Sequence, residues 1–134
     1  MGIATSTARG IATAGDRRPP ARYEHAAFLG YRHHRPYMFI FGGSSTDGQL
    51  LNDLWQLDLM TFQFEECSVR GSPPSPRTLH QGGCCLRNRQ KSCDRFYVWS
   101  GGAMHHAPVD ANGSPMYVLD IGGLIMRRRI LNKS

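Results

Sequence analysis

The chain has 134 residues, 40% of them hydrophobic, with 15 glycines, 8 prolines and a formal net charge of +6. This length predicts one domain at most, and the turn-rich composition of the whole chain indicates a globular protein and excludes a coiled coil or a chain that is entirely a disordered tail. No apolar run approaches the roughly 18 residues of a membrane-spanning helix, so no membrane span is expected. The excess of cations favours acidic partners or anionic surfaces and says nothing about the fold.

Residues 1–18 show no sustained period and lack the apolar core of a secretory signal, so we expect a flexible N-terminal tail. Without such a signal, the cysteines are expected to be reduced thiols. They are Cys67, Cys84, Cys85 and Cys93.

Short strands are predicted from Pro19 onward. The apolar run Tyr37–Phe41 stops at Gly42-Gly43, a pair that permits positive φ and a close approach of another backbone. Phe62 and Phe64 are expected on one face of a fourth strand, by the period of two. The succession predicts an antiparallel all-β fold. The expected strands are Ala26–Leu29, Tyr37–Phe41, Asp53–Leu59 and Phe62–Val69, separated by a polar turn at Gly30–Pro36, a loop at Gly42–Asn52 and a short turn at Met60–Thr61.

The pattern then begins again. Arg22-x-x-His25 matches Arg77-x-x-His80 after 55 residues, and Leu57-Asp58 matches Leu119-Asp120 after 62. Between them, Phe39–Gly43 matches Val98–Gly102 after a shift of 59. A period of about 50 residues with four short strands per unit is typical of propeller blades.

On these features the sequence resembles the kelch-repeat family. The resemblance rests on Arg-x-x-His, on the apolar run closed by a glycine pair and on Asn52-Asp53-Leu54-Trp55-x-Leu57-Asp58, from Pro19 to about Ile121. It implies two kelch-type four-stranded antiparallel blades of an incomplete β-propeller, at 19–76 and, incomplete, at 77–121. The segments ARYEHAAF and GSPPSPRTLH are most similar to the kelch proteins that act as effectors of a late-endosomal Rab GTPase.

Residues 122–134 depart from the pattern, because GGLIMRRRILNKS has no aromatic residue and three consecutive arginines. The fourth strand of the second blade is therefore predicted to be replaced by an atypical basic tail. Complete propellers need about 4–8 blades. We therefore expect a fragment, a short isoform or a prematurely ended product, which leaves open that the chain has no function of its own or that it self-associates through exposed blade edges.

No metal site and no catalytic residue is predicted. His80, Cys84, Cys85 and Cys93 superficially offer four ligands, but neighbouring strand residues point to opposite faces, which favours buried small side chains. The pairs His33-His34 and His105-His106 are expected to be solvated loop residues. The sequence has no GxSxG motif and no phosphate loop, so we expect no enzyme and no cofactor. A copper oxidase-like propeller is the enzymatic alternative, and no ligand set for it is identifiable.

Residues that recur once per copy are expected to serve the fold. The resemblance assigns structural kelch positions to Arg22, His25, Gly42, Gly43, Trp55, Arg77, His80, Gly101 and Gly102.

The basic loops between first and second strands are the candidate partner-binding residues. Both should lie on one rim of the blades, where they would bind an acidic patch of a partner protein; the alternative is a scattered, solvated surface. Aromatic residues are not interleaved, so nucleic acid is not expected. The candidates are Arg32, His33, His34, Arg35, Arg87, Arg89 and Lys91.

The family resemblance implies a non-enzymatic protein-interaction module. Its closest branch implies binding to a Rab GTPase in its GTP form, in vesicle transport from endosomes toward the Golgi. This places the protein in the cytoplasm, peripheral on endosomal membranes. The alternative within the family is a general scaffold or a substrate receptor.

Overall fold

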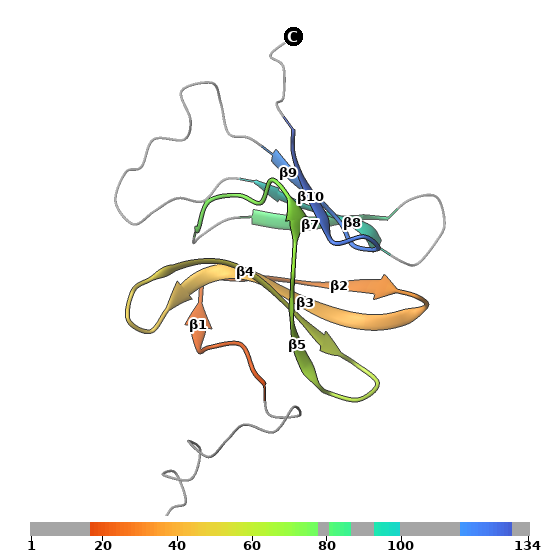
Figure 1. The fold of residues 1–134 in the computed structure, drawn as a ribbon, viewed down its shortest axis with the longest axis horizontal. Helices are drawn as coiled ribbons and strands as arrows, with labels where there is room; N and C mark the ends of the chain where they lie inside the picture. The colour runs from red at the N-terminus through yellow and green to blue at the C-terminus, as the bar shows by residue number, and fades with distance from the viewer. Residues whose placement is uncertain (1–16, 78–80, 87–92, 100–115, 130–134) are drawn as a thin grey trace, which may run out of the picture.

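The computed structural model describes residues 17–77, 81–86, 93–99 and 116–129. Every regular element in these ranges is a β-strand, and none of the described residues is helical. The strands form two sheets that lie one above the other (Figure 1). The predicted all-β class, with antiparallel sheets, is therefore confirmed.

Blade 1 is the sheet formed by the first five strands. Its antiparallel order is β2-β3-β4-β5, and the short β1 pairs with the same edge of β3 as β2. The strands are β1 (Arg22–Tyr23), β2 (Ala26–Arg32), β3 (Arg35–Ser45), β4 (Leu50–Asp58) and β5 (Phe64–Cys67).

Blade 2 is the sheet formed by the last five strands. Its antiparallel order is β7-β8-β9-β10, and the two-residue β6 pairs in parallel with the outer strand β10. The segment after β5 runs from blade 1 to this outer edge (Figure 1). The strands are β6 (Arg70–Gly71), β7 (Gln81–Leu86), β8 (Cys93–Trp99), β9 (Met116–Asp120) and β10 (Ile125–Arg129).

The prediction that blade 2 has no fourth strand is wrong. β10 pairs with β9 over five positions, from Ile125 opposite Asp120 to Arg129 opposite Met116. Met126 fills the core position and is fully buried, so no aromatic residue is needed there. Because strand side chains alternate and β10 is near the edge, its arginines can reach solvent. The residue boundaries predicted for the two blades, 19–76 and 77–121, stay predictions.

The corners of blade 1 also differ from the expected ones. The Gly42-Gly43 pair, with φ of 64° and 95°, does not end β3 but bends it, with a register shift between Phe41 and Gly43. Phe62 does not share a strand face with Phe64: it has a φ of 56° and is 74% exposed in the turn that precedes β5. A positive φ is incompatible with the extended backbone that the period of two assumes.

One hydrophobic core lies between the two blades. Phe28 of β2 stacks on Phe96 of β8, with ring centroids 3.5 Å apart and planes 9° from parallel. Burial of a large apolar side chain contributes about 1.5–3 kcal/mol, so this shared core is the main link between the sheets. Its members are Phe28, Phe39, Phe41 and Leu54 from blade 1 and Phe96, Val98, Tyr117, Leu119, Ile121 and Met126 from blade 2.

The connection between the blades is also held by backbone hydrogen bonds. Arg77 donates its N–H to the Leu51 carbonyl and accepts from the Gly43 N–H, both at 3.1 Å. Near the other end of the same connection, the Ser72 N–H donates to the Met126 carbonyl at 2.9 Å. The segment is therefore tied to both sheets.

The cross-strand register defines which positions of the two blades correspond. Tyr37 lies opposite Asp58, and Arg95 lies opposite Asp120. Because the two Leu-Asp pairs match, Tyr37 corresponds to Arg95, a shift of 58 rather than the predicted 59. A shift of one residue exchanges the two faces of a strand. Phe39 thus corresponds to Tyr97 and not to Val98.

Candidate functional site

The candidate site is the rim where the β2–β3 and β4–β5 turns meet, at the right of Figure 1. The first turn has only two central residues, His33 and His34, with φ of 49° and 64°. Positive φ at both central residues is the requirement of a type I′ hairpin turn, and histidine is among the residues that tolerate it. Both side chains are exposed.

Arg35 and Pro36 join the two turns. Arg35 Nη2 donates to Asp58 Oδ2 at 2.6 Å, and the Leu59 N–H donates to the Pro36 carbonyl at 3.2 Å. Four of the seven predicted binding residues lie at this hairpin. Arg35, however, already has a carboxylate partner.

Asp58 organises the β4–β5 turn. Its Oδ1 accepts from the N–H groups of Met60 and Thr61, at 2.8 and 3.3 Å, and its carbonyl accepts from the Phe62 N–H at 2.7 Å. Burial alone would raise the pKa of the carboxyl group, but the N–H groups of Met60 and Thr61, together with Arg35, lower it below its ordinary value. The turn is therefore fixed by its own hydrogen bonds.

The fixed turn presents two apolar side chains to solvent. Met60 is 67% exposed and Phe62 is 74% exposed. Aromatic residues and methionine are enriched in protein interfaces, and a rigid turn loses little conformational entropy when a partner binds. Sequence reasoning missed both, because Phe62 was assigned to a strand face and Met60 to a plain turn. The Asp58-Leu59-Met60-Thr61 sequence, with a capping aspartate, was the available signal.

Arg32 does not extend into solvent with the histidines. Its Nη1 donates to Gln56 Oε1 at 2.8 Å, and Gln56 Nε2 donates to Glu65 Oε2 at 2.8 Å. Its Nε atom is buried and has no hydrogen-bond partner among the described residues. The predicted role of Arg32 in binding a partner stays a prediction, and the structure places it in a polar chain beneath the rim.

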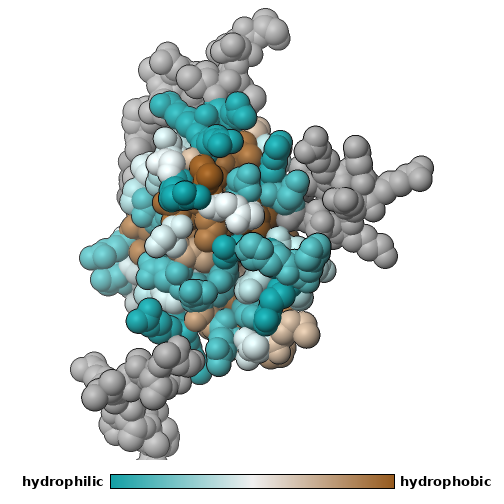
Figure 2. All heavy atoms as spheres, turned by 45° about the vertical axis from the view of Figure 1, so that its right-hand side comes forward, coloured by the Kyte–Doolittle hydropathy of each residue, from teal (hydrophilic) through white to brown (hydrophobic). Residues whose placement is uncertain are grey.

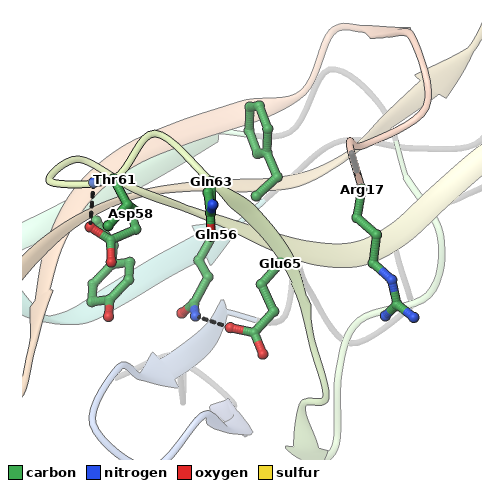
Figure 3. Close-up of a pocket in the computed structure, with 8 residues that line it drawn as sticks. Arg17, Gln56, Asp58, Thr61, Gln63 and Glu65 are labelled. Carbon is green, nitrogen blue, oxygen red and sulfur yellow. Dashed lines mark hydrogen bonds between the residues drawn. The ribbon is translucent and has the colours of Figure 1, made fainter. Parts of the chain in front are cut away.

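An open hollow of about 440 Å³ lies beside this chain (Figure 3). Figure 3 shows the hydrogen bonds Gln56–Glu65 and Thr61–Asp58 at its wall, with Arg17 across from them. The side chains that line this hollow include both positively and negatively charged ones. Its lining residues are Arg17, Tyr37, Gln56, Asp58, Thr61, Gln63, Phe64 and Glu65.

The surface around the rim is mainly hydrophilic. Figure 2, in which the right-hand side of Figure 1 comes forward, shows mostly hydrophilic side chains, with hydrophobic ones gathered near the middle and in smaller groups at the edges. Along the turn, the exposed apolar residues Met60 and Phe62 alternate with the exposed polar residues Thr61 and Gln63. The other predicted binding residues, Arg87, Arg89 and Lys91, lie outside the described residues.

Several predicted structural positions meet at the opposite end of blade 1. Arg22 donates from Nη1 and Nη2 to the two carboxylate oxygens of Asp53, at 2.6 and 2.8 Å, and from Nη1 to the Gly42 carbonyl at 3.1 Å. Trp55 Nε1 donates to the same carboxylate at 2.7 Å. A side chain on Gly43 would meet the backbone of Tyr23 and His25.

The equivalent positions of blade 2 are described only in part. Arg77 is buried, donates from Nε to the Ser75 carbonyl at 3.1 Å and lies over the Tyr117 ring, 5.2 Å from its centroid. His80, Gly101 and Gly102 lie outside the described residues, so their structural roles stay predictions.

Among the described residues, no three His, Cys, Asp or Glu side chains are grouped as a metal site would require. Of the four superficial ligands, Cys84 and Cys85 belong to β7 and Cys93 to β8, and His80 lies outside the described residues. In the same ranges no helix has the length and apolar character to cross a membrane.

The amino-acid sequence of this chain is similar to those of several named proteins. Tip elongation aberrant protein 1 of Schizosaccharomyces pombe is 33% identical over 107 residues, which are 80% of this chain and 8% of that protein. Two proteins named Rab9 effector protein with kelch motifs also match. The one from Mus musculus is 34% identical over 66% of this chain and 21% of its own length. The one from Xenopus laevis is 30% identical over 74% of this chain and 24% of its own length.

The chain thus spans less than a quarter of the length of each of these relatives. The family described as the KLHDC2/KLHL20/DRC7 Kelch-repeats domain matches residues 2–128. This match covers nearly the whole chain and agrees with the two repeated four-stranded sheets. The chain therefore belongs to the kelch-repeat family and is a kelch-repeat protein-interaction module.

Proposed function

We propose that this module binds its partner through the rim, and that the partner is a Rab GTPase in its GTP form. The observation that carries the first part is the pair Met60 and Phe62, exposed on a turn that Asp58 fixes by three hydrogen bonds. Truncation of a few such anchor residues removes most of the affinity of a typical interface. The histidines and the polar residues beside them would supply the surrounding polar contacts.

The second part of the proposal is supported by the relatives. Two of them carry the name Rab9 effector protein with kelch motifs and match 66% and 74% of the chain at 34% and 30% identity. A Rab GTPase exposes different switch-loop conformations in its GTP and GDP forms, so an effector prefers the GTP form. Binding would bring the protein to endosomal membranes as a peripheral, non-enzymatic component of vesicle transport.

The test is a titration of the 134-residue chain with Rab9 loaded with a non-hydrolysable GTP analogue or with GDP. We expect binding of the GTP form only. Phe62→Ala is expected to weaken it by about tenfold or more. Gln49→Ala, an exposed position in the β3–β4 loop at the opposite end, is the matched control and should bind as the original chain does.

The two parts fail separately. Equal binding of the GDP form, or no binding, contradicts the Rab assignment. Binding that is selective for GTP but unchanged in Met60→Ala and Phe62→Ala contradicts the rim as the binding surface.

A further inference from the structure

Each blade has two faces, and among the described residues only one face of each blade packs against the other blade. We call the face that blade 1 turns toward blade 2 its leading face; its members include Phe28, Phe39, Phe41 and Leu54. The face that blade 2 turns toward blade 1 is its trailing face, with Phe96, Val98, Tyr117 and Leu119. The internal interface is therefore a leading face packed on a trailing face.

The register identifies the leading face of blade 2. Because Tyr37 corresponds to Arg95, Phe39 corresponds to Tyr97 and Phe41 to Trp99. Trp99 is 37% exposed and Tyr97 is half-buried, whereas Phe39 and Phe41 in blade 1 are fully buried. Trp99, which occupies in blade 2 the position of Phe41 in blade 1, thus lies at the surface.

The trailing face of blade 1 shows the complementary difference. Three positions that hold fully buried residues in blade 2 hold half-buried apolar residues here, whereas Ile40 and Trp55 on the same face are buried. Tyr31, on the same face of β2, is 37% exposed. The corresponding pairs are Met38 with Phe96, Leu57 with Leu119 and Phe64 with Met126.

Charges on the outer strands are also complementary. Arg127 lies opposite Val118 and Arg129 opposite Met116, so both arginines share the leading face of blade 2. Both are exposed, and no carboxylate of the described residues pairs with them. Glu66 lies opposite Trp55 and is exposed on the trailing face of blade 1. The two unused faces thus match in apolar positions and in charge.

We propose that the leading face of blade 2 binds the trailing face of blade 1 in a second copy of this chain. The contact repeats, between two molecules, the packing that joins the two blades within one. Such a contact is head-to-tail, and it forms a ring if the rotation closes and an open chain if it does not.

The experiment measures the molar mass of the 134-residue chain by light scattering over a range of concentrations. We expect a mass that rises with concentration to multiples of 15.0 kDa. Trp99→Glu damages only the leading face of blade 2, and Tyr31→Glu only the trailing face of blade 1. Each variant alone is expected to remain a single chain.

The decisive sample is an equal mixture of the two variants. The Tyr31→Glu chain keeps an intact leading face and the Trp99→Glu chain an intact trailing face, so the mixture should form a two-chain complex that cannot grow further. Met60→Glu, on the rim and on neither face, is the control and should associate as the original chain does. Thermal melts of each variant by circular dichroism confirm that it is folded.

Three results would overturn the proposal. The first is a single-chain mass of the original protein at every concentration. The second is a folded Trp99→Glu variant that associates as the original does. The third is a mixture in which the two folded single-chain variants do not combine, because the intact leading face of one variant would then fail to bind the intact trailing face of the other.

Discussion

Phe28 and Phe96, 68 positions apart in the sequence, stack with their ring centroids 3.5 Å apart across the boundary between the blades. Phe28 also stacks on Phe39 within blade 1, at 5.1 Å. The three rings form a continuous column, so the stability of each blade depends on the other.

Replacing Phe96 by alanine is therefore expected to destabilise the whole chain and not only blade 2. A buried Phe→Ala change costs about 3–5 kcal/mol, a large part of the 5–15 kcal/mol that is typical of a small domain. Urea unfolding followed by circular dichroism measures the change. Phe62→Ala, at an exposed phenylalanine, is the control and should stay within about 0.5 kcal/mol. Equal effects of the two substitutions would contradict the shared core.

Asp53→Asn should weaken blade 1 at neutral pH. The Arg22 side chain is only 4% exposed and makes a bidentate pair with Asp53. Hydrogen bonds to a charged group contribute about 1.5–3 kcal/mol, and the loss should be of this order. Arg22→Lys keeps the charge and loses the bidentate geometry, so it should also destabilise. The free energies of unfolding of the original chain, Asp53→Asn and Arg22→Lys are compared at neutral pH.

The effect of Asp53→Asn should depend on pH. Burial alone would raise the pKa of Asp53, but hydrogen bonds from Arg22 and Trp55 and the charge of Arg22 lower it below its ordinary value. A lowered folded-state pKa gives stability that is present above the unfolded pKa of about 3.9 and is lost as the pH falls through the folded value. The difference between the two proteins should therefore shrink below about pH 4. A constant difference from neutral pH to pH 3 would contradict the ion pair's contribution.

Gly43→Ala should be more damaging than Gly48→Ala, although both glycines have positive φ, 95° and 84°. A Cβ on Gly43 would lie 2.6 Å from the Tyr23 carbonyl oxygen, whereas one on Gly48 meets no atom within 4 Å. Gly48→Ala is expected to cost about 1–2 kcal/mol for the left-handed backbone alone. Gly43→Ala adds the overlap with β1. Melting temperatures of the two variants rank the effects, and a larger loss at Gly48 would count against the close approach of β1.

Cys67 should react slowly with alkylating reagents in the folded chain. Burial raises the pKa of its thiol to about 12; the charge of Arg32 lowers this pKa, and the charges of Glu65 and Glu66 raise it. Since the thiolate is the nucleophile, alkylation near neutral pH should be at least about a hundredfold slower than in the unfolded chain. Mass spectrometry of the Cys67 peptide after timed iodoacetamide treatment measures the rate. Similar rates with and without denaturant would show that the thiol is accessible in the folded state.

The repeat could be found from the sequence because its strongest signals are tied to backbone geometry. Gly42-Gly43 has a positive φ at both residues, and Arg22 and Trp55 meet at one carboxylate, so these motifs mark fixed corners of the blade. The register within the strands could not be found in the same way. The glycine pair fixes where the strand bends, whereas the cross-strand hydrogen bonds determine the face of each side chain. By these hydrogen bonds Phe39 corresponds to Tyr97, one residue before the predicted Val98.

The rim was predicted only in part. The position of the basic hairpin followed from strand order, but the sequence gives no sign that Arg32 turns to Gln56 or that Arg35 pairs with Asp58. Such pairings depend on contacts between strands more than 20 positions apart. Likewise, three arginines in a row suggested a tail, because β10 forms through its pairing with β9 and not through its own propensity.

The parallel pairing of β6 with β10 also affects the order of events during synthesis. Arg70 and Gly71 pair with a strand 55 positions later, so β6 cannot form its strand pairing until Met126 has emerged from the ribosome. A contact of such separation forms late and slowly. Until then blade 2 lacks its outer strands, and its exposed apolar surface is what chaperones would protect.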